Sequence, residues 1–431
     1  MIVVGAGVAG LSTAYMLQQQ GRSVVLLEAA GAGGGRVHTR RSDGFLVDTG
    51  AQFLLQGCDH TLRLVDELGI GGSVEKVRLP SALWVDGRTY VQPKHEAGLL
   101  TFPGLSWRAR LSASKIAFSV LRHHRLYDVG APERAPCAHQ TVMEFARDDQ
   151  ELLDKVFDPL ACVFAAADSD RAGIAPLLNL SVAARGSASV FTFRGGMETL
   201  TRALQSRVDV RFDCDVLSVE GGPRPQVTLS DGSSSTCRAC VLAVPAPDCV
   251  ELYPDIPADE QPFVTASTYS KVVLVTCELD RRVDEGPFYA AIFPRSPARK
   301  LSYIAFEHRK AADRAPAGRG LVSVVAAPPL SRDLMDEDDE TIEETLVTAA
   351  GGYFPEVSRA FRRAHVVRWR RALPEFTPVT LERRAGFLAR PLRSIDYAGD
   401  WLVSPSIEGA IRSARIASAR VHRWLSGDRR A

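Results

Sequence analysis

The first 36 residues carry the strongest constraint on the fold. A short β-branched run at 2–4 reads as a buried strand, and a second apolar run at 24–27 ends in Glu28. Between them lies a G-x-G-x-x-G turn that opens a stretch with helical spacing, its glycines being Gly5, Gly7 and Gly10. This order of strand, glycine turn, helix and strand predicts a βαβ unit of the kind that binds dinucleotides.

Each glycine of the turn has a separate physical task in such a unit. Gly5 permits the tight turn, Gly7 lets the backbone approach a pyrophosphate, and Gly10 lets helix and strand pack closely. Val8 and Ala9 then begin the helix, whose unpaired N–H groups and positive dipole end face the phosphates. We therefore expect these five residues to contact the cofactor.

The acidic residue at the end of the second strand indicates which dinucleotide binds. Glu28 stands where a carboxylate accepts hydrogen bonds from both ribose hydroxyls, and Ala29 follows it at the same site. A carboxylate here repels a 2′-phosphate, which disfavours NADP. FAD and NAD both remain open at this point.

A second glycine motif ends at Arg36, eight residues after Glu28, and distinguishes these two cofactors. The arrangement E-A-x(4)-G-G-R, which ends in Gly34, Gly35 and Arg36, resembles the flavin-binding N-terminus of the amine oxidase, protoporphyrinogen oxidase and phytoene desaturase superfamily. A guanidinium at this place neutralises a pyrophosphate through paired hydrogen bonds, which a domain that binds only NAD does not need. The resemblance implies FAD as the cofactor.

The C-terminal segment resembles the same superfamily at a second place. Its sequence runs Y-A-G-D-W and then P-S-I-E-G-A, which implies that Gly399 and Asp400 hold the ribityl-phosphate region of FAD. The last helix would begin at Ile407 and point its positive end at the flavin C2 carbonyl. Val216 matches the position at which, in members of this superfamily, the backbone contacts the adenine of FAD. Both ends of the chain are therefore expected to bind one FAD.

These anchors predict an α/β fold of two domains. A Rossmann-like, glutathione-reductase-type FAD-binding domain is expected to be discontinuous, and an α+β substrate-binding domain is inserted into it. The predicted FAD-binding parts are 1–75, 186–262 and 376–431. The predicted substrate-binding parts are 76–185 and 263–375. Turn signals at Asp43-Gly44 and Asp86-Gly87 predict hairpins, and a long helical pattern at 141–167 is expected to break at Pro159.

The catalytic residues are inferred from the resemblance. It places Gln52 and Phe53 beside the flavin ring and Lys271 on a strand that faces flavin N5. There the lysine binds a water and assists the reoxidation of the flavin by O2, and burial with few partners lowers the pKa of such a lysine. An exposed lysine at a strand edge, which protects against aggregation, is the alternative.

The aromatic residues that flank the substrate in amine oxidases are not all matched. Ser406 stands where one such aromatic residue is expected, and Trp401 or Phe376 partly replaces it in our interpretation. The segment from Trp369 to Pro374 and the C-terminal pattern are closer to protoporphyrinogen oxidase and phytoene desaturase members. The branch of the superfamily therefore stays open at the level of sequence.

Charge and composition exclude several other classes. Basic and acidic residues nearly cancel (52 − 51 = +1), which argues against a nucleic-acid partner. The only close cysteine pair, Cys237 and Cys240, is interpreted as packing, with no metal site. No apolar run is long enough for a membrane span, and the first residues already form a strand, so we expect no signal peptide and a cytoplasmic location. The oligomeric state is left open.

One segment raises the question of a membrane. Residues 107–127 form a basic amphipathic pattern that predicts a helix. Members of the superfamily dock on membranes to collect oily substrates, and peripheral contact through this helix is one interpretation. An ordinary core helix with a solvated basic face is the interpretation that the sequence favours.

The function expected from these observations is that of an FAD-dependent oxidoreductase. It takes a hydride from a C–H of a hydrophobic or amphipathic small molecule, with C–N oxidation to an imine, O2 as acceptor and a place in biosynthesis. Lys271 favours this reaction, whereas the C-terminal pattern favours C–C desaturation or protoporphyrinogen-oxidase-like dehydrogenation. A nicotinamide-dependent dehydrogenase and a non-catalytic flavin-binding protein are the rival classes.

Overall fold

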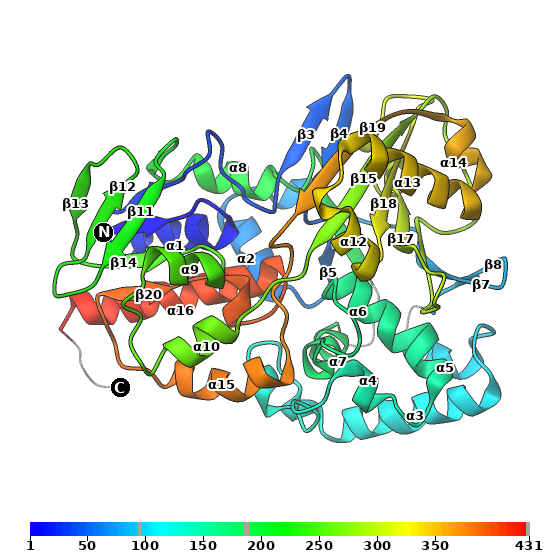
Figure 1. Cartoon of the computed structure of the whole chain (residues 1–431), viewed down its shortest axis with the longest axis horizontal. Helices are drawn as coiled ribbons and strands as arrows, with labels where there is room; N and C mark the ends of the chain where they lie inside the picture. Colours follow the sequence, from blue (N-terminus) through cyan, green and yellow to red (C-terminus); the bar gives the residue numbers. More distant parts are fainter. Residues whose placement is uncertain (94–95, 185–188, 428–431) are drawn as a thin grey trace.

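The computed structural model describes residues 1–93, 96–184 and 189–427. Two sheets and a group of helices divide the molecule into three parts (Figure 1). Among the helices of these residues, none is both long and apolar enough to cross a bilayer.

The glycine turn belongs to a five-stranded sheet with the order β10-β2-β1-β14-β20. Its strands are all parallel, and their bounds are Ile2–Val4 (β1), Val25–Leu27 (β2), Val210–Arg211 (β10), Cys240–Leu242 (β14) and Ile395–Tyr397 (β20). Helices α1 (Val8–Gln19) and α16 (Ile407–Leu425) pack side by side against it (Figure 1). A sheet of this kind is buried on both faces, which is why its strands are short apolar runs. The predicted Rossmann-like fold is confirmed.

The second sheet has seven strands in the order β19-β15-β18-β17-β16-β7-β8. Their bounds are Ser81–Val85 (β7), Arg88–Val91 (β8), Val272–Leu279 (β15), Ala290–Ile292 (β16), Leu301–Phe306 (β17), Gly320–Ala326 (β18) and Phe361–Trp369 (β19). Helix α13 (Asp339–Tyr353) packs against it, and the two share an aliphatic and aromatic core. Strands of the two sheets alternate along the chain, and the division into domains stays a prediction.

A helical cap lies beside the second sheet and carries its own apolar core. Its main helices are α3 (Trp107–Arg122), α4 (Val142–Phe145), α5 (Gln150–Leu152), α6 (Asp158–Phe164) and α7 (Ile174–Ala183). The break expected at Pro159 lies earlier, because the chain turns after Phe145 and passes through a π-helical turn at 153–157. Pro159 is the second residue of α6, which follows the π-helical turn without a break.

Two tight hairpins fix the edges of these parts. Strands β3 (Thr39–Ser42) and β4 (Phe45–Asp48) are joined by Asp43 and Gly44. Strands β7 and β8 are joined in the same way by Asp86 and Gly87. All four turn residues have φ between 46° and 82°. This geometry is that of the type I′ turn which Asp-Gly favours, so both predicted hairpins are confirmed.

Shorter elements connect these parts. The strands are β5 (Leu54–Leu55), β6 (Val74–Lys76), β9 (Val190–Phe193), β11 (Val216–Glu220), β12 (Gln226–Leu229) and β13 (Ser234–Thr236). The helices are α2 (Asp59–Glu67), α8 (Thr199–Gln205), α9 (Ala246–Leu252), α10 (Gln261–Ala266), α11 (Glu307–Lys310), α12 (Pro328–Asp333), α14 (Pro355–Arg359) and α15 (Pro378–Leu388). Single 3-10 turns include η2 (Glu96–Thr101), η3 (His124–Leu126), η6 (Ala312–Arg314) and η8 (Asp400–Leu402).

Candidate active site

A cavity of about 1180 Å³ is lined by the parallel sheet, the second sheet and the cap together. Its volume exceeds the roughly 300–1,000 Å³ of an ordinary small-molecule pocket, which leaves room for a dinucleotide and a substrate. The parallel-sheet domain lines it with the glycine turn, with Glu28 and with residues 399–400. We call one further part of the wall the chamber, and its residues are Gln52 to Cys58, Val129, Cys162 to Phe164, Ala166, Leu180, Ala183, Val272, Leu274, Tyr303, Val325 and Trp369. Outside the chamber, charged residues also line the cavity, among them Asp215, Asp248, Glu251, Arg370, Arg371 and Glu408.

The glycine turn has the geometry of a phosphate cradle. Gly5 has φ +98°, and a Cβ on Gly10 would lie 1.8 Å from the carbonyl oxygen of Gly5. A Cβ on Gly7 would meet nothing within 4 Å, and Gly7 lines the cavity. No side chain caps the first turn of α1, which begins at Val8 and contains no acidic residue in that turn. The turn therefore offers space and backbone N–H groups to an anionic group.

Glu28 is fixed beside this turn by two backbone donors. Its Oε2 accepts from the Ala6 N–H at 2.6 Å, and its Oε1 accepts from the Ala30 N–H at 3.0 Å. Glu28 and Ala29 both line the cavity, as do Val216, the first residue of β11, and Cys214, two residues before it. The carboxylate and the start of β11 thus line the same cavity, and the ribose and adenine assignments stay predictions.

Arg36 joins the two ends of the chain. Its Nη1 and Nη2 donate to the two carboxylate oxygens of Asp400 at 2.8 and 2.9 Å, and Nη1 also donates to the Ala372 carbonyl at 2.6 Å. The Tyr269 ring centre lies 5.5 Å from the guanidinium carbon. Burial is the largest single influence and lowers the pKa of Arg36, but the charges and hydrogen bonds of Asp400 and Tyr269 together outweigh it, and the net shift of that pKa is upward. Arg36 and Gly35 line the cavity, so the charge faces the region predicted for the pyrophosphate.

The C-terminal anchor is built on η8 and α16. Gly399 and Asp400 line the cavity, and the Gly399 N–H donates to Ser413 Oγ at 2.9 Å. Ile407 begins α16 at the cavity wall, and the Ser406 side chain caps that helix by accepting from the Gly409 N–H. The positions of these residues fit FAD as the dinucleotide. The contacts that Gly399, Asp400 and Ile407 are expected to make with FAD stay predictions.

Two predicted catalytic residues do not reach the cavity. Lys271 is exposed and precedes β15, where alternation turns Val272 and Leu274 toward the chamber and Lys271 toward the other face. The exposed strand-edge alternative describes its position, and its expected place beside N5 is corrected accordingly. Trp401 is 1% exposed, stacks on Phe263 and donates from Nε1 to the Val244 carbonyl.

The aromatic wall of the chamber comes from other residues. Phe53, at the predicted place, meets Phe164 of α6 edge to face with ring centres 6.2 Å apart. Trp369 lies at the end of β19 and its Nε1 donates to the Thr49 carbonyl at 2.7 Å, while Tyr303 comes from β17. Phe376, the other suggested replacement, is buried in the cap core. Phe164 and Tyr303 were missed because no motif marks the inward face of their elements.

The residues grouped as the chamber include no Asp, Glu, Lys, Arg or His, whereas Arg370 and Arg371, which follow Trp369, line the adjoining part of the cavity. The two thiols of the chamber, Cys58 and Cys162, stay protonated because burial raises the pKa of each to about 12. Glu408 of α16 also lines the cavity. Its carboxylate is engaged by the N–H groups of His60 and Thr61 and by the Thr61 hydroxyl.

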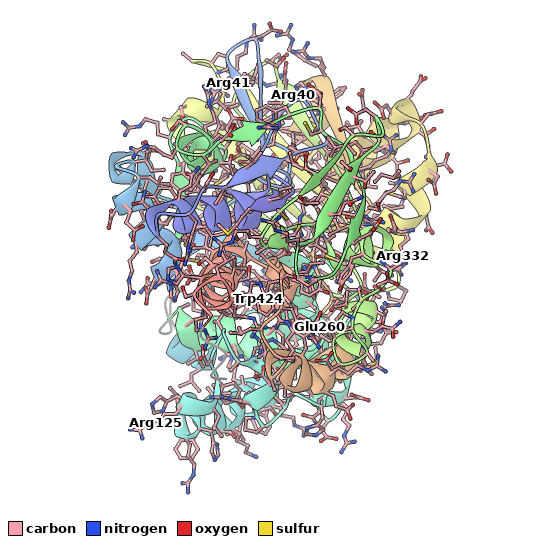
Figure 2. All side chains as sticks on the ribbon, turned by 90° about the vertical axis from the view of Figure 1, so that its left-hand side faces the viewer. Arg40, Arg41, Arg125, Glu260, Arg332 and Trp424 are labelled. Carbon is pink, nitrogen blue, oxygen red and sulfur yellow. The ribbon has the colours of Figure 1, made fainter. Side chains whose placement is uncertain are left out.

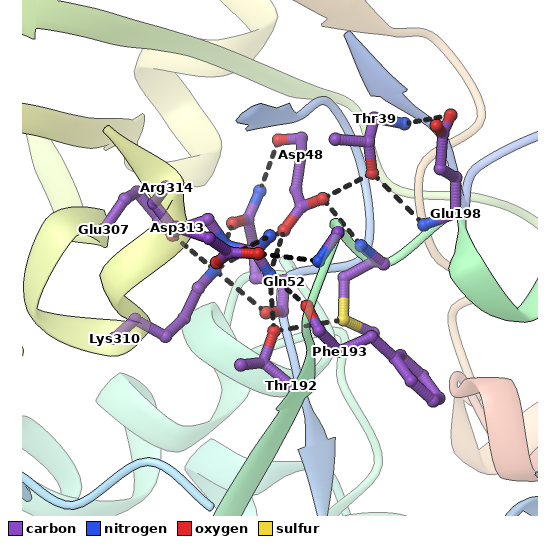
Figure 3. A network of polar contacts seen from close by, with 12 residues as sticks. Thr39, Asp48, Gln52, Thr192, Phe193, Glu198, Glu307, Lys310, Asp313 and Arg314 are labelled. Carbon is purple, nitrogen blue, oxygen red and sulfur yellow. Dashed lines mark hydrogen bonds and ion pairs between the residues drawn. The ribbon is translucent and has the colours of Figure 1, made fainter. Parts of the chain in front are cut away.

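A buried lysine lies behind this wall. Lys310 donates to the backbone carbonyl of Gln52 at 3.0 Å and to its side-chain Oε1 at 3.2 Å (Figure 3). It also pairs with Glu307, and its Nζ lies 3.7 Å from Asp48, which contacts Arg314 at 3.2 Å. All four charged side chains are at most 3% exposed. Lys310 therefore fixes a residue of the chamber without lining the cavity itself, and no sequence motif points to it.

Comparison with known proteins identifies the family. Residues 8–422 match the family model described as flavin containing amine oxidoreductase. Protoporphyrinogen oxidase 2 of Arabidopsis thaliana is 26% identical over 262 residues, which are 50% of this chain and 49% of that protein. Putrescine oxidase of Kocuria rosea is 43% identical over 70 residues, or 16% of this chain and 15% of that protein. The matched part thus spans half or less of these relatives.

Solved structures show the same fold over nearly the whole length. A putrescine oxidase triple mutant superposes with a TM-score of 0.82 at 15% identity and covers 98% of both chains. A putative protoporphyrinogen oxidase from Exiguobacterium sp. gives 0.75 at 18% identity and covers 99% of this chain and 98% of its own. The predicted FAD cofactor and the predicted superfamily are confirmed, and a small-molecule substrate follows from them. This chain belongs to the flavin-containing amine oxidoreductase family and is an FAD-dependent oxidoreductase.

Proposed function

We propose that this enzyme oxidises an apolar amine that enters the chamber without a charge, converting a C–N single bond to an imine with O2 as the final acceptor. The observation that carries this proposal is the neutral wall between Phe53, Phe164, Tyr303 and Trp369. Aromatic and aliphatic side chains bind apolar rings and chains by removing them from water. Membership of the amine oxidoreductase family supports the C–N reaction.

The neutral wall determines the protonation state of the bound amine. An ammonium group in this chamber would lose its hydration without gaining a carboxylate partner, and this costs several kcal/mol. An amine therefore binds as the free base, with its nitrogen lone pair intact. A second ammonium group at the far end of a diamine would meet the same penalty.

The residues that line the cavity would have two tasks: some would hold FAD, and others would orient the substrate. Bound FAD supplies the electron acceptor for the substrate. Glu28, the turn at Gly7 and the pair Arg36–Asp400 would hold it, since these groups line the cavity. Phe53 and Trp369 would orient the substrate, and both are fixed from behind, Phe53 by Phe164 and Trp369 by the Thr49 carbonyl.

An anaerobic screen tests this proposal through bleaching of the flavin absorption. We expect bleaching by monoamines with an apolar ring or chain, and at least ten times slower bleaching by short diamines of similar length. For a monoamine, kcat/KM should rise tenfold per pH unit below the pKa of the substrate amine. Equal rates for diamines, or a pH-independent kcat/KM, would contradict the neutral-amine proposal.

Dehydrogenation of a C–C bond is the second candidate. Two observations favour it: the match to the Arabidopsis thaliana protoporphyrinogen oxidase covers 50% of this chain, and a neutral chamber suits a substrate without an amine. Porphyrinogens and polyenes belong in the same anaerobic screen for this reason. Bleaching by these compounds, with none by amines, would replace the first candidate by the second.

A further inference from the structure

A second pocket adjoins the chamber where the cap meets α2 and α16. Its volume is about 270 Å³, and it is lined by Gly57, Asp59, Tyr127, Asp128, Val129, Val182, Ala183 and Arg412. Three of these residues, Gly57, Val129 and Ala183, also line the chamber. We call these three residues the neck, because they border both spaces. The other five border the outer part of the pocket, which we call the vestibule.

Two sides of the neck approach each other closely at Gly57. This glycine has φ +91°, and a Cβ placed on it would lie 2.4 Å from the Ala183 carbonyl oxygen, so the position requires glycine. The Ala183 Cβ lies 3.3 Å from the same point, which places the Ala183 methyl group beside Gly57. Val129 and Ala183 are therefore the neck positions at which a side chain of another size can be accommodated.

The backbone on both sides of Val129 is anchored to other elements. The Asp128 carbonyl accepts a hydrogen bond from Asn179 Nδ2 of α7 at 2.8 Å. The Gly130 carbonyl accepts from Arg384 Nη2 of α15, also at 2.8 Å. Val129 itself is buried. Its side chain is therefore held at the neck by two fixed peptide groups, and a change in its size acts on the passage at this point.

The vestibule is polar and reaches the solvent, whereas the neck is apolar. Asp59 is exposed, and the Asp128 side chain is 55% exposed. Arg412 of α16 reaches Asp128, with Nη2 and Oδ1 3.4 Å apart. Figure 2 shows Arg125, three residues before Asp128, at the lower edge of the molecule, so this segment belongs to the surface. A solute that passes the vestibule thus meets polar groups first and apolar groups at the neck.

The opposite end of the main cavity is expected to be filled by FAD. Glu28, Arg36 and Ile407 mark the expected course of the cofactor along the cavity wall. With FAD bound, a substrate needs access to the chamber from a side that the cofactor leaves free. None of the described residues that line the second pocket belongs to the set predicted to bind FAD. The second pocket therefore meets the chamber at such a side.

We propose that the substrate enters the chamber through this second pocket, and that Val129 and Ala183 set the largest cross-section of the substrate that the enzyme accepts. The class of substrate rests on the function proposed above, so the size limit applies to apolar amines. An apolar neck also suits an amine without a charge, because an ammonium group would lose its hydration there. A larger side chain at the neck narrows the passage and leaves Phe53 and Trp369 of the chamber in place.

Anaerobic stopped-flow reduction of the FAD-loaded enzyme tests the size limit. With benzylamine, Ala183→Leu should lower the second-order rate constant of flavin reduction at least tenfold and lower the limiting rate at saturation much less, because entry is slowed. Val129→Ala should raise the second-order rate constant for 1-naphthylmethylamine at least threefold relative to that for benzylamine. Ala419→Leu is the matched control, since Ala419 lies exposed on α16 and lines neither pocket, and it should react like the parent.

A reversible plug tests the route without relying on the substrate class. Ala183→Cys is labelled with benzyl methanethiosulfonate, and quenching of the fluorescence of bound FAD by acrylamide, a small neutral solute, measures access to the chamber. We expect the quenching constant to fall at least threefold on labelling and to recover when dithiothreitol removes the label. The parent and Ala419→Cys, treated in the same way, should show no such change.

The two experiments separate the entrance from the proposed function. If no amine bleaches the flavin, the proposed function fails, and the plug still decides the route. Unchanged quenching after complete labelling of Ala183→Cys would overturn the entrance, as would neck variants that react with both amines exactly as the control does. Thermal unfolding of each variant, compared with the parent, separates a narrowed passage from a damaged fold.

Discussion

Lys310 and Lys271 show how burial changes what a lysine does in this protein. The Lys310 side chain is 1% exposed and donates to Gln52 twice, while Lys271 is exposed at the start of β15. A buried ammonium requires partners, and Glu307, Asp48 and the Gln52 oxygens supply them. Lys310 is therefore a positioning residue for the segment that carries Phe53, whereas Lys271 contributes to the surface.

The substitution Lys310→Met should destabilise the folded protein strongly. It leaves the carboxylate of Glu307 buried without its cation, which typically costs about 3–5 kcal/mol. Urea unfolding measures this loss, and Lys271→Met should stay within about 0.5 kcal/mol of the parent. Lys271→Met should also leave flavin reduction and reoxidation unchanged in stopped-flow traces. A selective loss of reoxidation there would restore the role that its sequence context suggested.

Glu28→Ala should weaken the retention of FAD more than it weakens the fold. The variant removes the carboxylate expected to bind both ribose hydroxyls, and charge-assisted hydrogen bonds of this kind contribute about 1.5–3 kcal/mol each. We expect the Kd for FAD to rise at least tenfold, as measured by fluorescence titration of the apoprotein. Glu28→Gln is the control that keeps one acceptor oxygen and removes the negative charge, and an unchanged Kd in both variants would exclude the ribose assignment.

At the scale of elements, the glycine turn requires Gly10 and Gly7 for two different reasons. Gly10 is confined by the Gly5 carbonyl, whereas Gly7 borders open space in the cavity. Helix α1 therefore needs Gly10 in order to pack on β1, and it needs Gly7 only when a ligand approaches the backbone.

The variant Gly10→Ala should consequently lose stability, whereas Gly7→Ala should lose affinity for FAD. Gly10→Ala places a methyl group 1.8 Å from a backbone oxygen, so we expect lost folding or several kcal/mol of destabilisation. Gly7→Ala should keep the circular dichroism and the urea midpoint of the parent apoprotein but bind FAD at least tenfold more weakly. Normal FAD binding by Gly7→Ala would place the pyrophosphate elsewhere.

We expect the stability of the folded protein to depend on pH through His308, which lies on the short helix α11. It is 4% exposed, accepts from the Leu321 N–H through Nδ1 at 3.1 Å, and contacts the Val283 carbonyl through Nε2. Burial lowers the pKa of His308 below its ordinary value, so the unfolded chain binds a proton first as the pH falls. Stability should be full above about pH 6.5 and decline below it, by up to about 1.4 kcal/mol per pH unit.

Urea unfolding of the apoprotein between pH 8 and pH 5 measures this decline. His308→Asn should be less stable at pH 8 and show a shallower slope with pH, because the titrating group is gone. A slope equal to that of the parent would assign the pH dependence to other groups.

The sequence predicted those structural features that depend on the conformational preferences of single residues. The Asp-Gly hairpins and the glycine turn follow from φ preferences of single residues, and both appear as expected. The direction of a side chain on a buried strand depends on register instead, and one residue separates exposed Lys271 from Val272 in the chamber. Trp401 lies in the 3-10 turn η8, and its motif gave a position along the chain but not the direction of the side chain.

At the scale of the whole molecule, Arg36 and Asp400 hold together segments that are 364 positions apart. Their side chains are 29% and 7% exposed, and the paired geometry is that of a strong arginine–carboxylate contact. The parallel sheet also holds the two ends of the chain together, because β1 from the N-terminus and β20 near the C-terminus both pair with β14.

A double-mutant cycle should detect this pair in the apoprotein. Arg36→Met and Asp400→Leu should each reduce the unfolding free energy, and the double variant should lose less than the sum. We expect a coupling of about 1–3 kcal/mol from urea unfolding. Additive losses would mean that each residue acts through other partners, such as Ala372 for Arg36 and Trp401 for Asp400.

The contact between Arg36 and Asp400 also bears on how the enzyme is made in the cell. A ribosome adds about 5–20 residues per second, so roughly 20–70 s pass between the synthesis of the two partners. During that interval the nascent glycine turn lacks β14 for part of the time and lacks β20 and α16 until the end. The predicted FAD site is therefore incomplete until Asp400 has been synthesised, and we expect a chain that ends before this residue to retain no flavin.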